Sequence, residues 1–258
     1  MDNFKDNYII VCESRTGSTM LSTALWKHPQ ICSHGEILQP RQYTSKKRDD
    51  MLEFYGLNYD TPGAIHDLLR DTLVSDPVNY VCKYGFHTGR YKTAGFKFKY
   101  EEMECGLFDK VLDFLLDHTE IKIIHLTRDN LWHRYRSSYV AVKITKQFNS
   151  ANEPIKVDAP KVTLDISAIE KSFKQTLKWQ QKYKKMFENH DTLDLTYENI
   201  LNNKQQCFDT VTEHLQVDKQ EWDPWTKKVQ SVPDDDIIDN MENIREHFTG
   251  TVHEQLFV

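Results

Sequence analysis

The residues whose types and spacing point most directly to chemistry are Arg15-Thr16-Gly17-Ser18-Thr19, which follow a short apolar run at residues 8–12. Unsatisfied backbone N–H groups at the start of a helix attract anions, and the helix dipole is positive at that end. A glycine lets the backbone approach the anion closely, and an arginine adds a fixed positive charge with several donors. The motif predicts a cradle for a phosphate or sulfate group. It is equally typical of an ordinary strand-to-helix turn capped by Ser18, and the local pattern leaves both interpretations open.

Two common nucleotide-binding loops do not fit this stretch. The pattern GxxxxGK followed by serine or threonine requires a second glycine and a lysine, and residues 13–21 contain neither. The dinucleotide fingerprint GxGxxG is also absent after the apolar run. The loop therefore suits a phosphate-like anion without offering the lysine that holds the β- and γ-phosphates of ATP.

The elements that must position this loop predict an α/β fold. Apolar runs at residues 8–12 and 121–127 are typical of strands buried on both faces, as in a parallel sheet. Helical spacing of apolar residues comes after each run, over residues 18–27 and 130–146. Further strands are expected at 95–99 and 192–196, and further helices at 64–74, 103–116, 166–187 and from 197. This alternation predicts a P-loop-like, doubly wound, mainly parallel sheet with helices on both faces and ligands at the C-terminal ends of the strands.

Composition limits the class of protein. The 258 residues are 39% hydrophobic and 12% aromatic, enough to bury a core, and no apolar run is long enough for a transmembrane helix. A net charge of -6 disfavours nucleic acid or an anionic membrane as the main partner. The five cysteines are scattered without a CxxC pair, and the N-terminus has no signal-peptide anatomy, so a cytoplasmic location is expected.

Several stretches, taken in order, resemble the sulfotransferases that use 3′-phosphoadenosine 5′-phosphosulfate (PAPS). Residues 12–21 resemble the 5′-phosphosulfate loop of the carbohydrate-type branch, in which arginine replaces the lysine of cytosolic relatives. His28-Pro29 and Gly35-Glu36 resemble the next segment of that branch, and Gly95-Phe96-Lys97 resembles the strand before the family's central helix. Residues 124–131 with Ser137 resemble the 3′-phosphate motif. The C-terminal part matches the tail of bacterial nodulation-factor-type sulfotransferases at Asn240, Ile244, Phe248, Gly250 and Thr251.

The resemblance implies one sulfotransferase domain over residues 1–258. Its activity would be transfer of a sulfuryl group from PAPS to a hydroxyl or amine of a carbohydrate or small natural product, with PAP as the other product and no metal. The residues that it implies for binding PAPS are Arg15, Thr16, Gly17, Ser18, Thr19, Arg128 and Ser137. In many relatives the serine falls one residue earlier, where this chain has Arg136, so the choice between Ser137 and Ser138 stays open.

The position of Arg128 supports the resemblance on physical grounds. It ends a buried strand, at the edge where a doubly wound sheet binds ligands. The alternative is a surface arginine that caps a helix or pairs with Asp129. Arg134 and Arg136 either add charge to the site or belong to a solvated helix face.

Sulfuryl transfer requires a base for the acceptor proton, in-line geometry and charge stabilisation on the leaving phosphate. The resemblance implies that Glu36 is the base and that Arg15 stabilises the bridging oxygen. His34 is the next candidate for the base because an imidazole titrates near neutral pH. Lys97 and Lys99 either face the anion or form a solvated strand face.

Two other functions compete with a sulfotransferase. A P-loop-like kinase for a small metabolite would share the fold and require magnesium, but the missing lysine counts against it. A non-catalytic module would bind PAP, turn nothing over and tolerate the loss of Glu36. If the protein is a sulfotransferase, the poorly patterned segments 37–62 and 147–163 are expected to form the acceptor pocket, because long loops over a scaffold carry specificity.

Overall fold

The computed structural model describes residues 4–38, 71–145, 161–224 and 233–257. The chain divides into two compact units, the first made of Met1–Thr127 and Tyr183–Pro224 and the second of Arg128–Lys182 and Trp225–Val258. Residues 39–62 and 147–160, which make up most of the expected acceptor segments, lie outside the described residues. Of the helix expected at 64–74, residues 71–74 are described, and they are helical.

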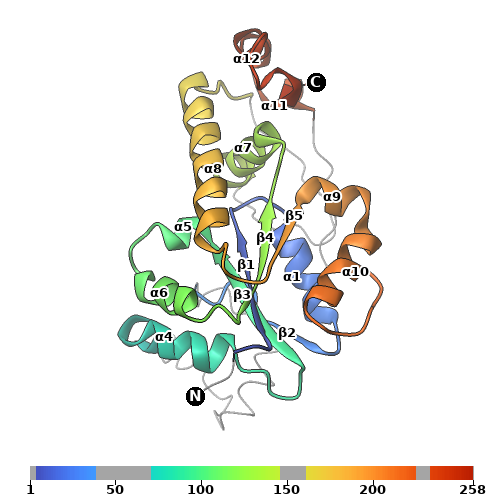
Figure 1. Ribbon diagram of the computed structural model, residues 1–258. Helices are drawn as coiled ribbons and strands as arrows, with labels where there is room; N and C mark the ends of the chain where they lie inside the picture. The colour runs from blue at the N-terminus through green and yellow to red at the C-terminus, as the bar shows by residue number, and fades with distance from the viewer. Residues whose placement is uncertain (1–3, 39–70, 146–160, 225–232, 258) are drawn as a thin grey trace. The chain divides into compact units, whose positions relative to one another are not determined.

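The first unit is built on a five-stranded sheet in the order β2-β3-β1-β4-β5 (Figure 1). The strands are β1 (Asn7–Cys12), β2 (Ile31–Ser33), β3 (Thr93–Lys99), β4 (Lys122–Thr127) and β5 (Thr192–Thr196). Every neighbouring pair in this sheet is parallel. The carboxyl ends of the strands therefore meet at one edge, and the strand order reverses beside β1, where doubly wound folds bind their ligands.

Helices cover both faces of this sheet (Figure 1). One face carries α1 (Ser18–Lys27), α9 (Tyr197–Asn202) and α10 (Lys204–His214). The other carries α4 (Pro77–Tyr80), the π-helix η2 (Val81–Gly85), α5 (Tyr100–Met103) and α6 (Asp109–Asp117). The doubly wound α/β fold predicted from the sequence is thus confirmed.

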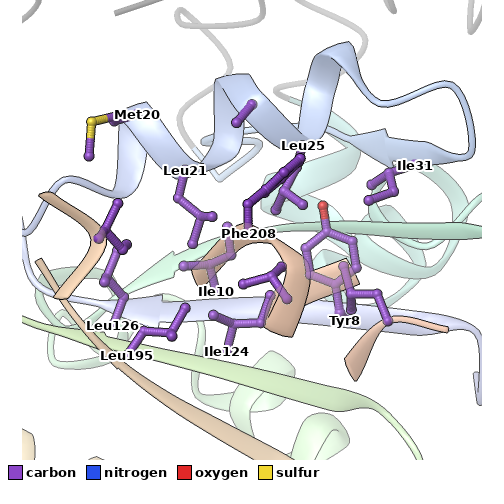
Figure 2. Packing of buried hydrophobic residues seen from close by; sticks show 14 of the residues in the cluster. Tyr8, Ile10, Met20, Leu21, Leu25, Ile31, Ile124, Leu126, Leu195 and Phe208 are labelled. Carbon is purple, nitrogen blue, oxygen red and sulfur yellow. The ribbon is translucent and has the colours of Figure 1, made fainter. Parts of the chain in front are cut away.

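The core of the first unit shows why β1 reads as a continuous apolar run. Tyr8 and Ile10 point toward α1, where Leu21, Leu25 and Phe208 of α10 pack over them (Figure 2). The intervening residues of β1 are also fully buried, on the opposite face of the sheet. Because both faces are covered, every position of the strand must be apolar or paired.

Two predicted helices differ from the structure. The helix expected at 103–116 is two helices, α5 and α6, separated by a turn in which Gly106 has a φ of 75°. The helix expected at 130–146 is α7 (Leu131–Tyr139) followed by the π-helix η3 (Val140–Thr145). The helical spacing of apolar residues continues through both segments. The sequence pattern therefore predicted one helix in each place where the backbone forms two elements. Strand β2 was not predicted because three residues carry no recognisable pattern.

The second unit has a helical core of its own. It contains α7, η3, the part of α8 (Ile166–Met186) up to Lys182, α11 (Asp234–Ile237), α12 (Met241–Phe248) and the 3₁₀-helix η4 (Glu254–Phe257). Trp132, Phe173 and Phe248 are buried together at its centre. The indole N–H of Trp132 donates to Asp234 at 2.7 Å. Among the helices of the described ranges, none is both long and apolar enough to cross a membrane.

Close contact between β3 and β1 requires a glycine at position 95. A Cβ there would lie 2.1 Å from the carbonyl oxygen of Tyr8. We expect Gly95→Ala to lower the free energy of unfolding by about 3 kcal/mol or more, because the backbones of two paired strands must separate. Gly106→Ala is the control: open space surrounds that position, and only its left-handed backbone costs about 1 kcal/mol. Denaturant unfolding measures both, and equal small losses would contradict the assignment.

Candidate functional site

The loop after β1 turns the chain into α1 through two residues with left-handed backbones. Arg15 has a φ of 72° and Gly17 a φ of 83°. The hydroxyl of Thr16, a residue only 1% exposed, donates to the carbonyl of Glu13 at 2.8 Å and stabilises the turn. The hydroxyl proton of Thr16 is thereby used within the loop. Arginine in a left-handed conformation is uncommon, so this residue is held there by its surroundings.

Helix α1 begins without a side-chain cap. Gly17 is the N-cap residue, and its carbonyl accepts the backbone N–H of Leu21 at 3.1 Å. The interpretation in which Ser18 caps the helix is wrong, because Ser18 is already the first residue of α1. A capping hydroxyl must come from the residue before the first helical one. The N–H groups of the first turn therefore point to the sheet edge without a side-chain acceptor at the cap, as an anion site requires.

The ring of Tyr197 packs against this loop. A Cβ on Gly17 would lie 2.5 Å from Cδ2 of Tyr197, so a side chain at position 17 would displace the ring. Burial lowers the pKa of Arg15 below its ordinary value, and the phenol of Tyr197 acts in the opposite direction. Tyr197 is the first residue of α9, directly after β5. Its position directly after a predicted strand was the sequence signal that could have placed Tyr197 at the ligand-binding edge of the sheet.

Glu36 reaches the same edge because the pairing of β2 with β3 continues past the end of β2. The backbone N–H of His34 donates to the carbonyl of Gly95, and the N–H of Lys97 donates to the carbonyl of Gly35, both at 2.8 Å. Gly35 has a φ of 69°, which turns the chain at this point. The register thus sets Glu36 beside the last residues of β3.

Two lysines of β3 hold the carboxylate of Glu36. Lys97 Nζ lies 2.8 Å from Oε1 and Lys99 Nζ lies 2.9 Å from Oε2. Lys97 also donates to the hydroxyl of Thr19 in α1 at 3.2 Å, and Lys99 lies 3.4 Å from a carboxylate oxygen of Glu102 in α5. We call these five residues the Glu36 cluster. The solvated-face interpretation of Lys97 and Lys99 is wrong: they are 3% and 8% exposed, because both faces of the sheet are covered.

Charge balance keeps Glu36 ionised. Burial would raise its pKa, but the ammonium groups of Lys97 and Lys99 outweigh burial and lower the pKa below 4.5. Burial acts to lower the pKa of Lys99, and the carboxylates of Glu102 and Glu36 raise it overall. At Glu102 burial dominates over Lys99, and the pKa is raised. The cluster therefore presents a carboxylate with a hydrogen bond on each oxygen, beside the first turn of α1.

His34, the other candidate base, lies one residue beyond β2. Its Nε2 is 3.4 Å from the sulfur of Cys32, which is 5% exposed. The ring of His34 therefore contacts the thiol of Cys32 in β2, whereas the carboxylate of Glu36 contacts the two lysines of β3. Of the two candidates, Glu36 is the one that shares a cation with helix α1.

Arg128 and Ser137 belong to the second unit. The carbonyl of Arg128, the residue after β4, accepts from the side-chain amide of Gln180 at 3.4 Å. Helix α7 then begins after Asn130, whose side chain caps it by accepting the N–H of His133 at 2.8 Å. Ser137 and Ser138 both lie in this helix and are partly buried.

The two other arginines of α7 do not lie on a solvated face, which corrects one interpretation of the sequence. Arg134 is 7% exposed and its guanidinium donates to the hydroxyl of Ser172 in α8. Arg136 forms an ion pair with Asp234 of α11. Both therefore have structural partners within the second unit.

His125 of β4 is a buried, hydrogen-bonded histidine. It is 3% exposed, with Nε2 2.6 Å from the hydroxyl of Tyr100 and Nδ1 3.0 Å from Asp194. Burial lowers the pKa of His125, and Asp194 opposes this. The neutral ring can accept the Tyr100 proton and donate to the carboxylate of Asp194, so it links α5, β4 and β5.

Sheet order, parallel pairing and the uncapped loop after β1 define a P-loop-like, doubly wound α/β protein. No protein-family model matches the sequence, and no curated protein does. The structure is similar to the crystal structure of a sulfotransferase from Alicyclobacillus acidocaldarius. The TM-score is 0.49 and the sequence identity 14%, and the match covers 97% of this chain and 95% of that one. Within the described part of the chain, no group of three or more His, Cys, Asp or Glu side chains could hold a metal ion.

The Glu36 cluster predicts a pH-dependent stability. Because the pKa of Glu36 is lowered in the folded state, its contribution is present at neutral pH and is lost as the pH falls below 4.5 toward that lower value. We expect Glu36→Gln to cost about 3 kcal/mol near neutral pH, because it leaves two buried ammonium groups without their carboxylate. The difference from wild type should shrink between about pH 5 and about pH 3.

Urea unfolding over a series of pH values measures this difference. Asp223→Asn is the control, because it removes an exposed partner of Lys27 and should change stability by less than about 1 kcal/mol at every pH. A Glu36→Gln difference that is the same at all pH values would contradict the ionisation assigned to Glu36.

Proposed function

We propose that the protein is a sulfotransferase that moves a sulfuryl group from PAPS to a hydroxyl or amine of a carbohydrate or small natural product. One observation carries the proposal: an ionised Glu36 lies beside the uncapped first turn of α1 and shares Lys97 with Thr19 of that turn. An anion site and a carboxylate that can take a proton thus meet at one edge of the sheet. The sequence resemblance to PAPS-dependent sulfotransferases accounts for both.

In this proposal, the N–H groups of the first turn of α1 and the guanidinium of Arg15 bind the 5′-phosphosulfate. Arg15 neutralises the charge that develops on the bridging oxygen as the sulfur leaves it. The resemblance assigns the 3′-phosphate to Arg128 and to Ser137 or Ser138. Tyr197 limits the room beside Gly17 and so shapes the loop for its ligand.

The transfer is a single displacement in which atoms and charges balance. The acceptor oxygen or nitrogen forms a bond to sulfur while the bond from sulfur to the 5′-phosphate oxygen breaks, which releases PAP. The acceptor proton passes to Glu36 and from there to water. A transition state with little bonding on either side depends on positioning and charge rather than on covalent chemistry.

The first test is calorimetric titration with PAP and, separately, with ATP plus magnesium. We expect micromolar binding of PAP without metal and no binding of ATP, because the loop lacks the lysine of ATP-binding P-loops. Arg15→Ala and Arg128→Ala should each weaken PAP binding by about 2–4 kcal/mol, through loss of a charged phosphate contact. ATP binding instead would favour a kinase, and unchanged PAP affinity in both variants would refute the site.

The second test separates an enzyme from a module that only binds PAP. We expect Glu36→Gln to bind PAP and to lower turnover by ~10²–10⁴-fold in an assay that follows PAP release with a panel of sugars and small hydroxyl compounds. The matched variant is Glu120→Gln, an exposed carboxylate beside His118, which should turn over like wild type. Unchanged turnover in Glu36→Gln would move the role of base to His34.

A further inference from the structure

The ammonium group of Lys97 contacts both parts of the proposed site, the carboxylate of Glu36 and the first turn of α1. It donates to Glu36 at 2.8 Å and to the hydroxyl of Thr19, the second residue of α1, at 3.2 Å. The residue is 3% exposed, so no solvent shell compensates its charge. A buried ammonium must keep an anionic or polar partner, and the two partners available to Lys97 belong to the carboxylate and to the anion-binding turn.

Lys99 is held differently. It lies between two carboxylates, with Glu36 at 2.9 Å and Glu102 at 3.4 Å. Its backbone N–H also donates to Glu102 at 2.8 Å, which fixes the start of α5 against the end of β3. Lys99 can therefore keep Oε2 of Glu36 in place whether or not Lys97 stays on Oε1.

We propose that Lys97 is a shared cation that neutralises Glu36 when the α1 turn is empty and turns to the anion when the turn is filled, which releases Oε1 of Glu36 for the acceptor proton. The inference rests on the proposed function and deepens it. Binding of PAPS and release of the Glu36 carboxylate are thereby coupled through the side chain of Lys97. Lys99 is the positioning residue that keeps the freed carboxylate oriented.

Charge competition is the physical basis of this coupling. A phosphate bound at the α1 turn carries more negative charge than one carboxylate and is assisted by the helix dipole, so it attracts Lys97 away from Glu36. Among the described residues, the charged groups that act on Glu36 are Lys97, Lys99 and the carboxylate of Glu102. Glu102 and Glu101 also act on Lys99. Loss of one of the two cations raises the proton affinity of Glu36. By linkage, binding of the anion and binding of a proton must then favour each other.

The experiment measures the protons taken up when PAP binds, by calorimetry in buffers of different ionisation enthalpy at about pH 4–5. If the pKa of Glu36 rises by ~1 on binding, wild type should take up more protons than Glu36→Gln, up to about half a proton at a pH midway between the two pKa values. Comparison with Glu36→Gln removes the protons that PAP itself exchanges. In Lys97→Met, the added uptake should disappear, because no shared cation is left to move.

Lys122→Met is the matched control. Lys122 is also a buried strand lysine, 8% exposed, but it lies at the opposite end of the sheet and donates to the carbonyl of His214. It should keep the wild-type proton uptake. Lack of PAP binding by wild type overturns the proposed function and the inference with it. PAP binding with equal proton uptake in wild type and Glu36→Gln overturns the inference alone.

If Lys97→Met does not fold, the comparison of wild type with Glu36→Gln still decides. The pH dependence of PAP affinity in wild type and Lys122→Met gives a second measure of the same linkage, since its slope counts the protons taken up. A slope accounted for entirely by the titration of PAP itself would also overturn the inference.

Discussion

A carboxylate buried at the edge of a sheet must be neutralised by charges that the sheet itself supplies, and Glu36 shows how this constraint organises the first unit. Its two partners, Lys97 and Lys99, stand two residues apart on β3 and therefore point to the same face. The register of β2 against β3 brings Glu36 level with them. Removing the carboxylate of Glu36 takes an anionic partner from both lysines at once, in a place where little water can replace it.

The same arrangement joins the carboxylate to the strand-to-helix turn that the central strand provides. Thr19 lies in the first turn of α1, and its hydroxyl is within reach of Lys97 because β1 and β3 are neighbours in the sheet. Glycine at position 95 lets these two strands pair. Parallel strands bring all such loops to one edge, so the proposed anion site after β1 and the carboxylate after β2 share that edge although Thr19 and Glu36 are 17 positions apart in the chain.

Much of the fold was predictable from the order of residues. β1, α1, β4, α8 and β5 each show a strong apolar period or a long apolar run, and the structure has them where the pattern indicates. The types and position of the loop residues from Arg15 to Thr19 led to the prediction of an anion site, and that role stays a prediction. Two pairs of helices were each predicted as one long helix. Gly106 and the π-helix η3 end the regular α-helix there, but the spacing of apolar residues continues past them.

The sequence by itself determined the doubly wound sheet and the turn at the head of α1, because both follow from local apolar spacing and from residues that are adjacent in the chain. It could name Glu36, Lys97 and Lys99 but not their relation. Only the tertiary structure decided that they form one cluster and that the ring of Tyr197 packs against Gly17 of the loop. The physical reason is that strand register and burial act between segments distant in the chain, and no local pattern records them.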